Sequence, residues 1–183
     1  MIRCLQPGDE EVFRRIRLEA LRAEPAAYAS TAADWEALPP EEWRRRLTAN
    51  PVFVAFQGAE PVGIMGLMAQ SSSKTAHRTM LIMVYLRPEQ RGTGLAGRLL
   101  RHAVDHARRL GHRQVELMVS AENPVARRFY EREGFRQIGC IPGGFLHEGR
   151  EVDAGGGWGR RAIKVSGPTR PSGREPPGVE AIG

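Results

Sequence analysis

The sequence is poor in cysteine, lysine and aromatic residues, and it has no long apolar run. Cys4 and Cys140 are the only cysteines among 183 residues, too few for a disulfide framework or a zinc site. No apolar run approaches the length of a membrane span, and the residues after Met1 do not resemble a signal peptide. We therefore expect a cytoplasmic protein that has no membrane segment and no metal.

Basic residues outnumber acidic residues, 27 to 21, which gives a formal net charge of +6. Nearly all of them are arginines, because Lys74 and Lys164 are the only lysines. A basic protein invites a nucleic-acid interpretation. However, the arginines are spread along the chain and do not alternate with aromatic residues in any block. Nucleic acid is therefore the less favoured partner, although an RNA-binding domain stays an alternative.

The length suits one ordinary domain, and the first half predicts a mixture of strands and helices. Residues 2–5 form a short strand in this interpretation, and Asp9 is placed as the N-cap of a helix that ends at Pro25. Residues 26–38 are expected to be irregular. A short helix follows over 40–47, and then come a hairpin of strands 52–56 and 61–69 and a flexible serine segment.

The second half predicts a nearly continuous apolar strand over 79–86 and a helix over 95–110 that is capped by Gly111. A strand over 115–119, a helix that Asn123 caps and a strand over 135–140 follow. The glycine run 154–159 is expected to break regular structure, with a brief strand over 162–165. The proline- and glycine-rich residues 166–183 predict a disordered tail after a domain of residues 1–165.

A glycine-rich segment between the apolar strand and its helix is the strongest functional signal. It consists of Arg91, Gly92, Thr93, Gly94, Leu95, Ala96 and Gly97. Glycine lets the backbone turn sharply and approach a ligand closely, and the helix that follows directs free N–H groups at the loop. Such a loop binds phosphate.

Three other interpretations of this segment fit less well. The spacing of the glycines, with Glu116 about twenty residues on, matches a dinucleotide-binding fingerprint. In that motif, however, the glycines follow the strand at once, and too little chain remains here for the further strand–helix units. A Walker A loop is excluded because no Gly-Lys-Ser/Thr sequence follows. A purely structural turn explains one glycine but not three.

The segment Arg91-x-x-Gly94-x-Ala96 resembles motif A of the GNAT superfamily of acyl-CoA-dependent N-acyltransferases. About thirty residues later, a second stretch is similar to another segment of that family; it runs from Ala121 through Asn123, Tyr130 and Glu131 to Phe135. Two motifs in the right order are more specific than one glycine loop. The resemblance covers roughly residues 1–153.

The resemblance implies an α/β fold with a mixed, mostly antiparallel sheet and a central parallel pair of strands that splay apart, flanked by helices. The pantetheine arm of acetyl-CoA is then expected along the 79–86 strand near Tyr85 and Leu86, with a further hydrogen bond from Asn123. The pyrophosphate is expected on the N–H groups of residues 91–97. No metal is implied, and dimers are common in the family, so a homodimer is one assembly that it allows.

The implied activity is transfer of an acetyl group from acetyl-CoA to a primary amine of a small molecule or peptide by direct attack. Tyr130 matches the tyrosine that serves as the general acid in the family. The general base is left open among Glu36, Glu116, His77 and a water chain. Cys140 has no paired histidine and is expected to be inert.

The C-terminal part departs from the family, because a glycine run stands where the family has an apolar final strand. We therefore expect that strand to be short or absent. A non-catalytic CoA-binding or regulatory module is the alternative function. The acceptor is not identified, because its specificity elements are expected in loops and short helices.

Overall fold

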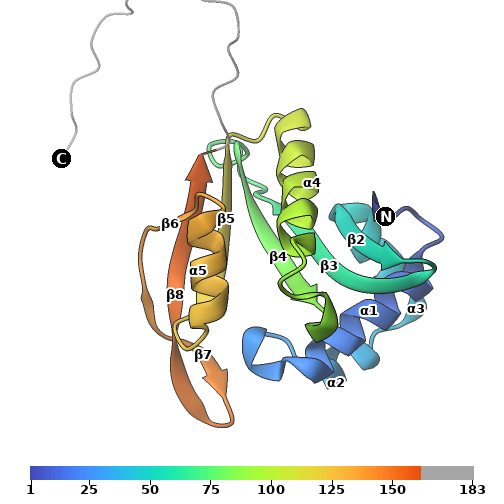
Figure 1. Cartoon of the computed structure of the whole chain (residues 1–183), viewed down its shortest axis with the longest axis horizontal. Helices are drawn as coiled ribbons and strands as arrows, with labels where there is room; N and C mark the ends of the chain where they lie inside the picture. The colour runs from blue at the N-terminus through green and yellow to red at the C-terminus, as the bar shows by residue number, and fades with distance from the viewer. Residues whose placement is uncertain (162–183) are drawn as a thin grey trace, which may run out of the picture.

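The computed structural model describes residues 1–161, which form an eight-stranded mixed sheet flanked by helices (Figure 1). The strands are β1 (Ile2–Cys4), β2 (Val52–Gln57), β3 (Glu60–Ala69), β4 (Arg78–Leu86), β5 (Gln114–Ser120), β6 (Arg136–Gln137), β7 (Ile141–His147) and β8 (Arg150–Arg161). The helices are α1 (Glu10–Ala23), α2 (Ala32–Glu36), α3 (Pro40–Ala49), α4 (Leu95–Arg109) and α5 (Pro124–Arg132), with 3-10 turns η1 (Pro25–Ala27) and η2 (Pro88–Gln90).

The strand order is β1-β2-β3-β4-β5-β8-β6, with β7 paired to β8. Pairing within residues 1–161 is antiparallel except between β4 and β5, which run parallel. That parallel pairing extends only over Arg78–Gln114, Thr79–Val115 and Met80–Glu116. Beyond these pairs the two strands diverge (Figure 1). The predicted fold class, including its splayed central pair, is therefore confirmed.

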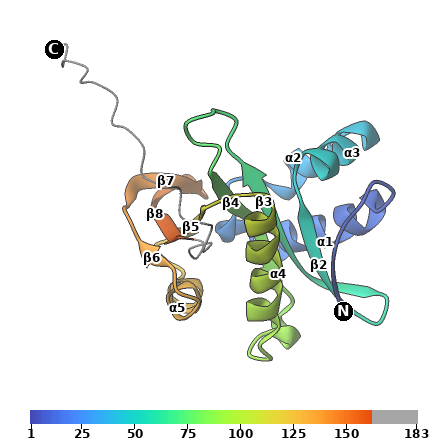
Figure 2. The same cartoon turned by 90° about the horizontal axis from the view of Figure 1, so that it is seen from above.

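Helices cover both faces of the first half of the sheet. This is required because successive apolar side chains of β2 point to opposite faces. Val52, Val54 and Phe56 pack against α1, α2 and α3, whereas Phe53 and Ala55 pack in the cluster under α4. Helix α5 joins the α4 cluster through Tyr130. Figure 2 shows α4 and α5 together, with α1 and α3 on the other side of β2 and β3. The hydrophobic core is thus two layers separated by the sheet.

Local signals place most elements where the sequence predicts them, with two exceptions near the N-terminus. Residues 26–38 are not irregular throughout, because η1 and α2 lie there. Helix α2 begins at a capping box in which the Thr31 hydroxyl accepts from the Asp34 N–H and Asp34 accepts from the Thr31 N–H. Asp9 does stand at the N-cap of α1, but its carboxylate binds Arg3 and the Gln6 N–H rather than the helix.

The prediction that the glycine run breaks regular structure and that the final strand is short or absent is wrong. Strand β8 spans twelve residues and pairs with β5, β6 and β7. A strand between two partners is held by its backbone hydrogen bonds, which glycine supplies as well as any residue. Gly144 permits the close approach of β7, because a Cβ there would lie 2.5 Å from the Cβ of Ala154. The predicted strand 162–165 and tail 166–183 lie outside the described residues.

Strand β6 is shorter than predicted, because only Arg136–Gln137 of the expected strand 135–140 forms it. The described residues contain no helix that is both long and apolar enough to cross a membrane. Nor do they contain a cluster of three or more histidine, cysteine or acidic side chains that could hold a metal ion.

We predict that the backbone amides of residues 154–161 exchange slowly with solvent. Residues 154–155 and 158–161 are paired with β5, and residues 158–159 are also paired with β6, so opening this segment requires breaking the second half of the sheet. Hydrogen exchange followed by mass spectrometry measures this, with the exposed turn at Glu148 and Gly149 as the fast-exchanging internal control. Exchange of residues 154–161 at the rate of that turn would contradict the pairing.

Candidate functional site

The glycine segment forms the turn between η2 and α4, and two of its glycines have backbone angles that favour glycine. The φ angle is +78° at Gly92 and +77° at Gly94, which is the N-cap residue of α4. A side chain at either position would be strained. The Thr93 hydroxyl donates to the carbonyl of Gln90 at 2.7 Å and so fixes the turn. The sequence therefore sets a rigid loop directly before a fifteen-residue helix.

The loop and the first turn of α4 present a group of unpaired backbone donors. Within residues 1–161, no protein acceptor contacts the N–H groups of Gly92, Thr93, Gly94, Ala96 and Gly97. The Leu95 N–H makes only a long contact, 3.4 Å, with the Thr93 hydroxyl. Free N–H groups at the positive end of a helix dipole bind anions. The loop thus fits the pyrophosphate of acetyl-CoA.

Arg91 and Gly97 of the glycine-rich segment also have roles in packing the segment against the rest of the protein. The Arg91 N–H donates to Pro88, and its guanidinium contacts Glu24 at 2.6 Å and the Leu86 carbonyl at 3.2 Å. Arg91 therefore braces the loop against the turn after α1. Gly97 allows α4 and α5 to approach, since a Cβ there would lie 2.8 Å from the Glu133 carboxylate.

A bulge in β4 shapes the strand edge that faces the gap. The register with β3 shifts between Ile64 and Gly66, and Met83 opposite this point has a φ of +56°. A non-glycine residue in this region is uncommon, and it bends the strand where it occurs. Gly66 accommodates the bulge, because a Cβ there would lie 2.5 Å from the Met83 side chain. β4 therefore turns away from β5 at its C-terminal half.

The predicted cofactor residues Tyr85 and Leu86 point their backbone groups in opposite directions. The Arg87 N–H donates to Val62 of β3, and backbone groups alternate along a strand, so those of Tyr85 also face β3. The N–H groups of Val84 and Leu86 therefore face the unpaired edge. The Tyr85 hydroxyl contacts Glu19 at 3.2 Å on the α1 side.

A tyrosine that the sequence analysis did not assign to the site reaches this edge. The Tyr28 hydroxyl donates to the Val84 carbonyl at 2.8 Å. Burial raises the pKa of this phenol well above its usual range, so it remains a donor. With the Leu86 carbonyl contacted by Arg91, the N–H groups are the backbone groups left for a ligand at the edge.

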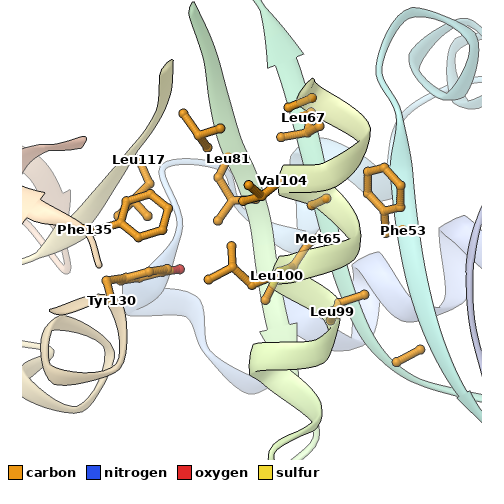
Figure 3. Close-up of a cluster of buried hydrophobic side chains, with 14 of the residues drawn as sticks. Phe53, Met65, Leu67, Leu81, Leu99, Leu100, Val104, Leu117, Tyr130 and Phe135 are labelled. Carbon is orange, nitrogen blue, oxygen red and sulfur yellow. The ribbon is translucent and has the colours of Figure 1, made fainter. Parts of the chain in front are cut away.

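Tyr130, the predicted general acid, lies on α5 with its ring packed against Phe129 and Phe135. Only 5% of the residue is exposed, and it lines the cavity described below. Figure 3 shows the oxygen directed away from α5, toward α4 and β4. Burial raises the pKa of Tyr130 far above its ordinary value, so the phenol keeps its proton at physiological pH.

Asn123 holds α5 in this position as the sequence predicts. Its side-chain oxygen accepts from the Ala126 N–H at 3.0 Å, and Pro124 occupies the first helical position. The carbonyl of the side chain is thus used by the cap. Its Nδ2 donor remains for a ligand.

A cavity of about 580 Å³ is lined by some of these residues, but Tyr85, Leu86 and the glycine-rich segment 91–97 are not among its lining. One part lies between the diverging strands and is lined by Val84, Asn123 and Tyr130. The other part extends under α1, α2 and α3 and is lined by residues that include Arg17, Tyr28, Trp35, Arg46 and Met68. The volume is that of a typical small-molecule site.

The three side chains considered as general bases do not line this cavity. Glu116 is buried and accepts from Arg78 and Gln114 at the paired end of β4 and β5. Glu36 contacts Arg22 at the protein surface. His77 precedes β4 at the same end as Glu116. No carboxylate or histidine is among the residues of 1–161 that line the cavity.

The sequence-based prediction did not include Tyr28 and Arg17 in the site. Only Arg17 has a position in the sequence pattern that could have indicated it. The apolar stripe of α1 contains Phe13, Ile16, Ala20 and Leu21, and Arg17 falls within that stripe. A charged residue on a buried helix face is a recognisable anomaly. Cys140, which was expected to be inert, is exposed and does not line the cavity.

Comparison with known proteins identifies the family. The sequence pattern of the Acetyltransferase (GNAT) family matches residues 15–135. An uncharacterized N-acetyltransferase of Methanocaldococcus jannaschii, MJ1207, is 29% identical over 104 residues, which cover 56% of this chain and 46% of that protein. The mycothiol acetyltransferase of Brachybacterium faecium is 28% identical over 131 residues, 72% of this chain and 39% of that protein. The chain thus spans less than half the length of these two curated relatives.

The fold agrees with that assignment. The structure of YncA from Salmonella typhimurium, which contains acetyl-CoA, superimposes with a TM-score of 0.73 at 20% identity and covers 92% of this chain and 97% of that one. At this identity the similarity concerns the fold. The family pattern, however, matches well over half of the chain and includes both motifs. The protein therefore belongs to the acetyltransferase (GNAT) family.

Proposed function

We propose that the protein transfers the acetyl group of acetyl-CoA to a primary amine of a small molecule by direct attack. The observation that carries this proposal is the convergence on one cavity of the unpaired edge of β4 and the Tyr130 hydroxyl, next to the loop of free N–H groups. These groups suit the thioester, the leaving sulfur and the pyrophosphate respectively. Most of the residues that contribute them were predicted from the sequence.

The chain's own groups account for binding of the co-substrate. Backbone donors from Gly92 to Gly97 hold the pyrophosphate, and the Nδ2 of Asn123 and the N–H groups at the β4 edge hold the pantetheine arm. Most of these donors are main-chain groups fixed by secondary structure. They therefore need little reorganisation when the ligand binds.

The chemical step needs a donor for the oxyanion and a proton for the leaving thiolate. A N–H at the β4 edge donates to the carbonyl oxygen of the thioester as negative charge develops there. The amine nitrogen forms a bond to the carbonyl carbon, the carbon–sulfur bond breaks, and Tyr130 gives its proton to the sulfur. The proton that the attacking nitrogen loses passes to solvent or back to the tyrosinate, so the products are the amide and CoA thiol.

The non-catalytic CoA-binding module remains the rival function. It shares the glycine loop and the splayed strands, but it gives no role to a protonated tyrosine that lines the cavity. Binding of CoA with no turnover of any amine by the wild-type protein would favour that module. An RNA-binding domain would instead lose affinity steeply with added salt and ignore CoA.

We expect Tyr130→Phe to lower kcat by about a hundredfold and to leave the affinity for CoA unchanged, because the variant loses the proton donor but keeps the packed ring. Steady-state kinetics and a thermal-shift titration with CoA measure the two quantities. Tyr85→Phe is the matched control, since its hydroxyl contacts Glu19 outside the cavity. Equal losses in both variants would contradict the acid role of Tyr130.

Gly94→Ala should raise the KM for acetyl-CoA by roughly tenfold, because an alanine at a positive φ costs about 1 kcal/mol and displaces the donors of the loop. Gly111→Ala is the matched control. Gly111 has a φ of +85° at the far end of the same helix, with open space around it. Both variants should lose similar stability in urea unfolding, and only the first should lose acetyl-CoA affinity. Parallel KM changes would argue against the loop as the cofactor site.

The pH dependence of kcat/KM should follow the acceptor amine rather than a protein group. Activity should rise with pH as the amine loses its proton, because no carboxylate or histidine lines the cavity within residues 1–161. For two acceptors with different amine pKa values, the acidic limbs of the two kcat/KM profiles should be displaced along the pH axis by that difference. A limb that stays fixed between acceptors, and moves in Glu116→Gln or His77→Gln, would reveal a protein base.

A further inference from the structure

The far part of the cavity contains a buried arginine without an acid partner. Arg17 lies on the core-facing side of α1 and is only 4% exposed. Its guanidinium stacks on the rings of Tyr28 and Trp35, with its central carbon 4.7 Å and 4.5 Å from the two ring centres. Burial lowers the pKa of Arg17 to about 10, and the side chain stays charged at neutral pH.

The in-plane donors of this guanidinium have no partner. Among the described residues, no acceptor contacts Nε or Nη1, although both atoms are buried, and no carboxylate lies within ion-pair distance of the group. The aromatic rings cover the faces of the guanidinium and stabilise its charge. They do not satisfy donors that lie in its plane. A buried charge in this state is costly unless an anion joins it.

The other two arginines that line the cavity share a single acid partner. Arg45 and Arg46 both contact the carboxylate of Glu42, at 2.6 Å and 2.8 Å. Arg46 also stacks on Trp35, with its central carbon 4.4 Å from the ring centre. Among the described lining residues, Arg17 is therefore the arginine without any acid partner, and the rings of Tyr28 and Trp35 hold it in place.

Tyr28 connects this charge to the reacting end of the cavity. One face of its ring meets Arg17, and its hydroxyl binds the Val84 carbonyl at the unpaired edge of β4. A single tyrosine side chain thus spans the interval between the guanidinium and the strand expected to hold the thioester. A small molecule with an anionic group at Arg17 can place a nearby amine at that strand.

We propose that Arg17 binds a carboxylate of the acceptor, so that the acceptor is a small amino acid or a related amine that carries a carboxylate. This inference rests on the proposed acetyltransferase function and specifies its substrate class. A guanidinium pairs with a carboxylate through two parallel N–H donors, a geometry that an ammonium group does not provide. Polyamines are disfavoured in the same cavity, because three arginines repel them and no carboxylate of the described lining attracts them.

Matched acceptors test the proposal directly. L-Phenylalanine and 2-phenylethylamine differ by one carboxylate, as do L-methionine and 3-(methylthio)propylamine, and each pair keeps its side chain. Wild-type protein should acetylate the carboxylate-bearing member of a productive pair with a kcat/KM about ten- to a hundredfold higher. A ratio near one, or a preference for the neutral-tailed amines or for spermidine, would overturn the proposal.

Arg17→Gln should remove that preference and bring the ratio close to one, and Arg17→Met does the same with a side chain that still fills the space between the rings. Arg44→Gln is the matched control, because Arg44 is exposed, contacts Glu10 and does not line the cavity. A carboxylate preference that survives in both Arg17 variants would assign the selectivity elsewhere.

A binding measurement separates this proposal from the activity. N-acetyl-L-phenylalanine, the product of the first pair, should bind the CoA-saturated wild-type protein in calorimetry at least tenfold more tightly than N-phenethylacetamide, and Arg17→Gln should abolish the difference. Equal binding of the two products to wild type would sink the proposal even if amines are acetylated. Absence of CoA binding and of turnover would instead refute the proposed function.

Discussion

The site depends on an interruption in the middle of the sheet, where β4 and β5 stop pairing after three residues each. A strand edge with unpaired N–H and C=O groups is unfavourable inside a protein, and proteins usually pair or cover it. Here the bulge at Met83 turns the strand, while Tyr28 and Arg91 bind the two carbonyls and leave the donors. The interruption thus leaves backbone donors at the strand edge, which is where we propose that the pantetheine arm binds.

The glycine loop and the part of the cavity under α1 offer different kinds of positive potential to a ligand. The glycine loop offers a phosphate only backbone dipoles, which carry no net charge and are fixed by the start of α4. The part under α1 uses the full charge of Arg17, held by aromatic faces. Backbone recognition depends on the fold and accompanies the whole family, whereas a charged side chain can change with the substrate. The acceptor is therefore to be sought in the residues around Arg17.

The parts of the structure that the sequence predicts are those controlled by local chemistry. Asn123 and Pro124 mark the start of α5, Gly92 and Gly94 have the positive φ angles that their turn requires, and the apolar run of β4 lies at the sheet's centre. The roles of Tyr130 and the loop donors follow from the resemblance to the family and stay predictions.

The parts that the sequence does not predict depend on contacts between distant residues. Strand β8 looks like a glycine-rich break, and only its partners β5, β6 and β7 give its backbone a ladder. The conformation of Met83 follows from the register between β3 and β4, which no local pattern encodes. Tyr28 and Val84 are 56 residues apart. Arg17 was detectable in principle, because it interrupts an apolar stripe, but its partners were not.

The lining of the cavity also bears on how an amine can react without a protein base. An ammonium group in this cavity meets no carboxylate among the described residues, and it loses the water that solvates it. Both effects disfavour the charged form and lower the pKa of the amine. A carboxylate on the acceptor would pair with Arg17. The ammonium group of the same acceptor would then lose the attraction of that carboxylate, which otherwise stabilises the charged form. The arginine that selects the acceptor would thereby help to convert it to the neutral nucleophile, and the protein would need only to hold the proton of Tyr130 for the departing sulfur.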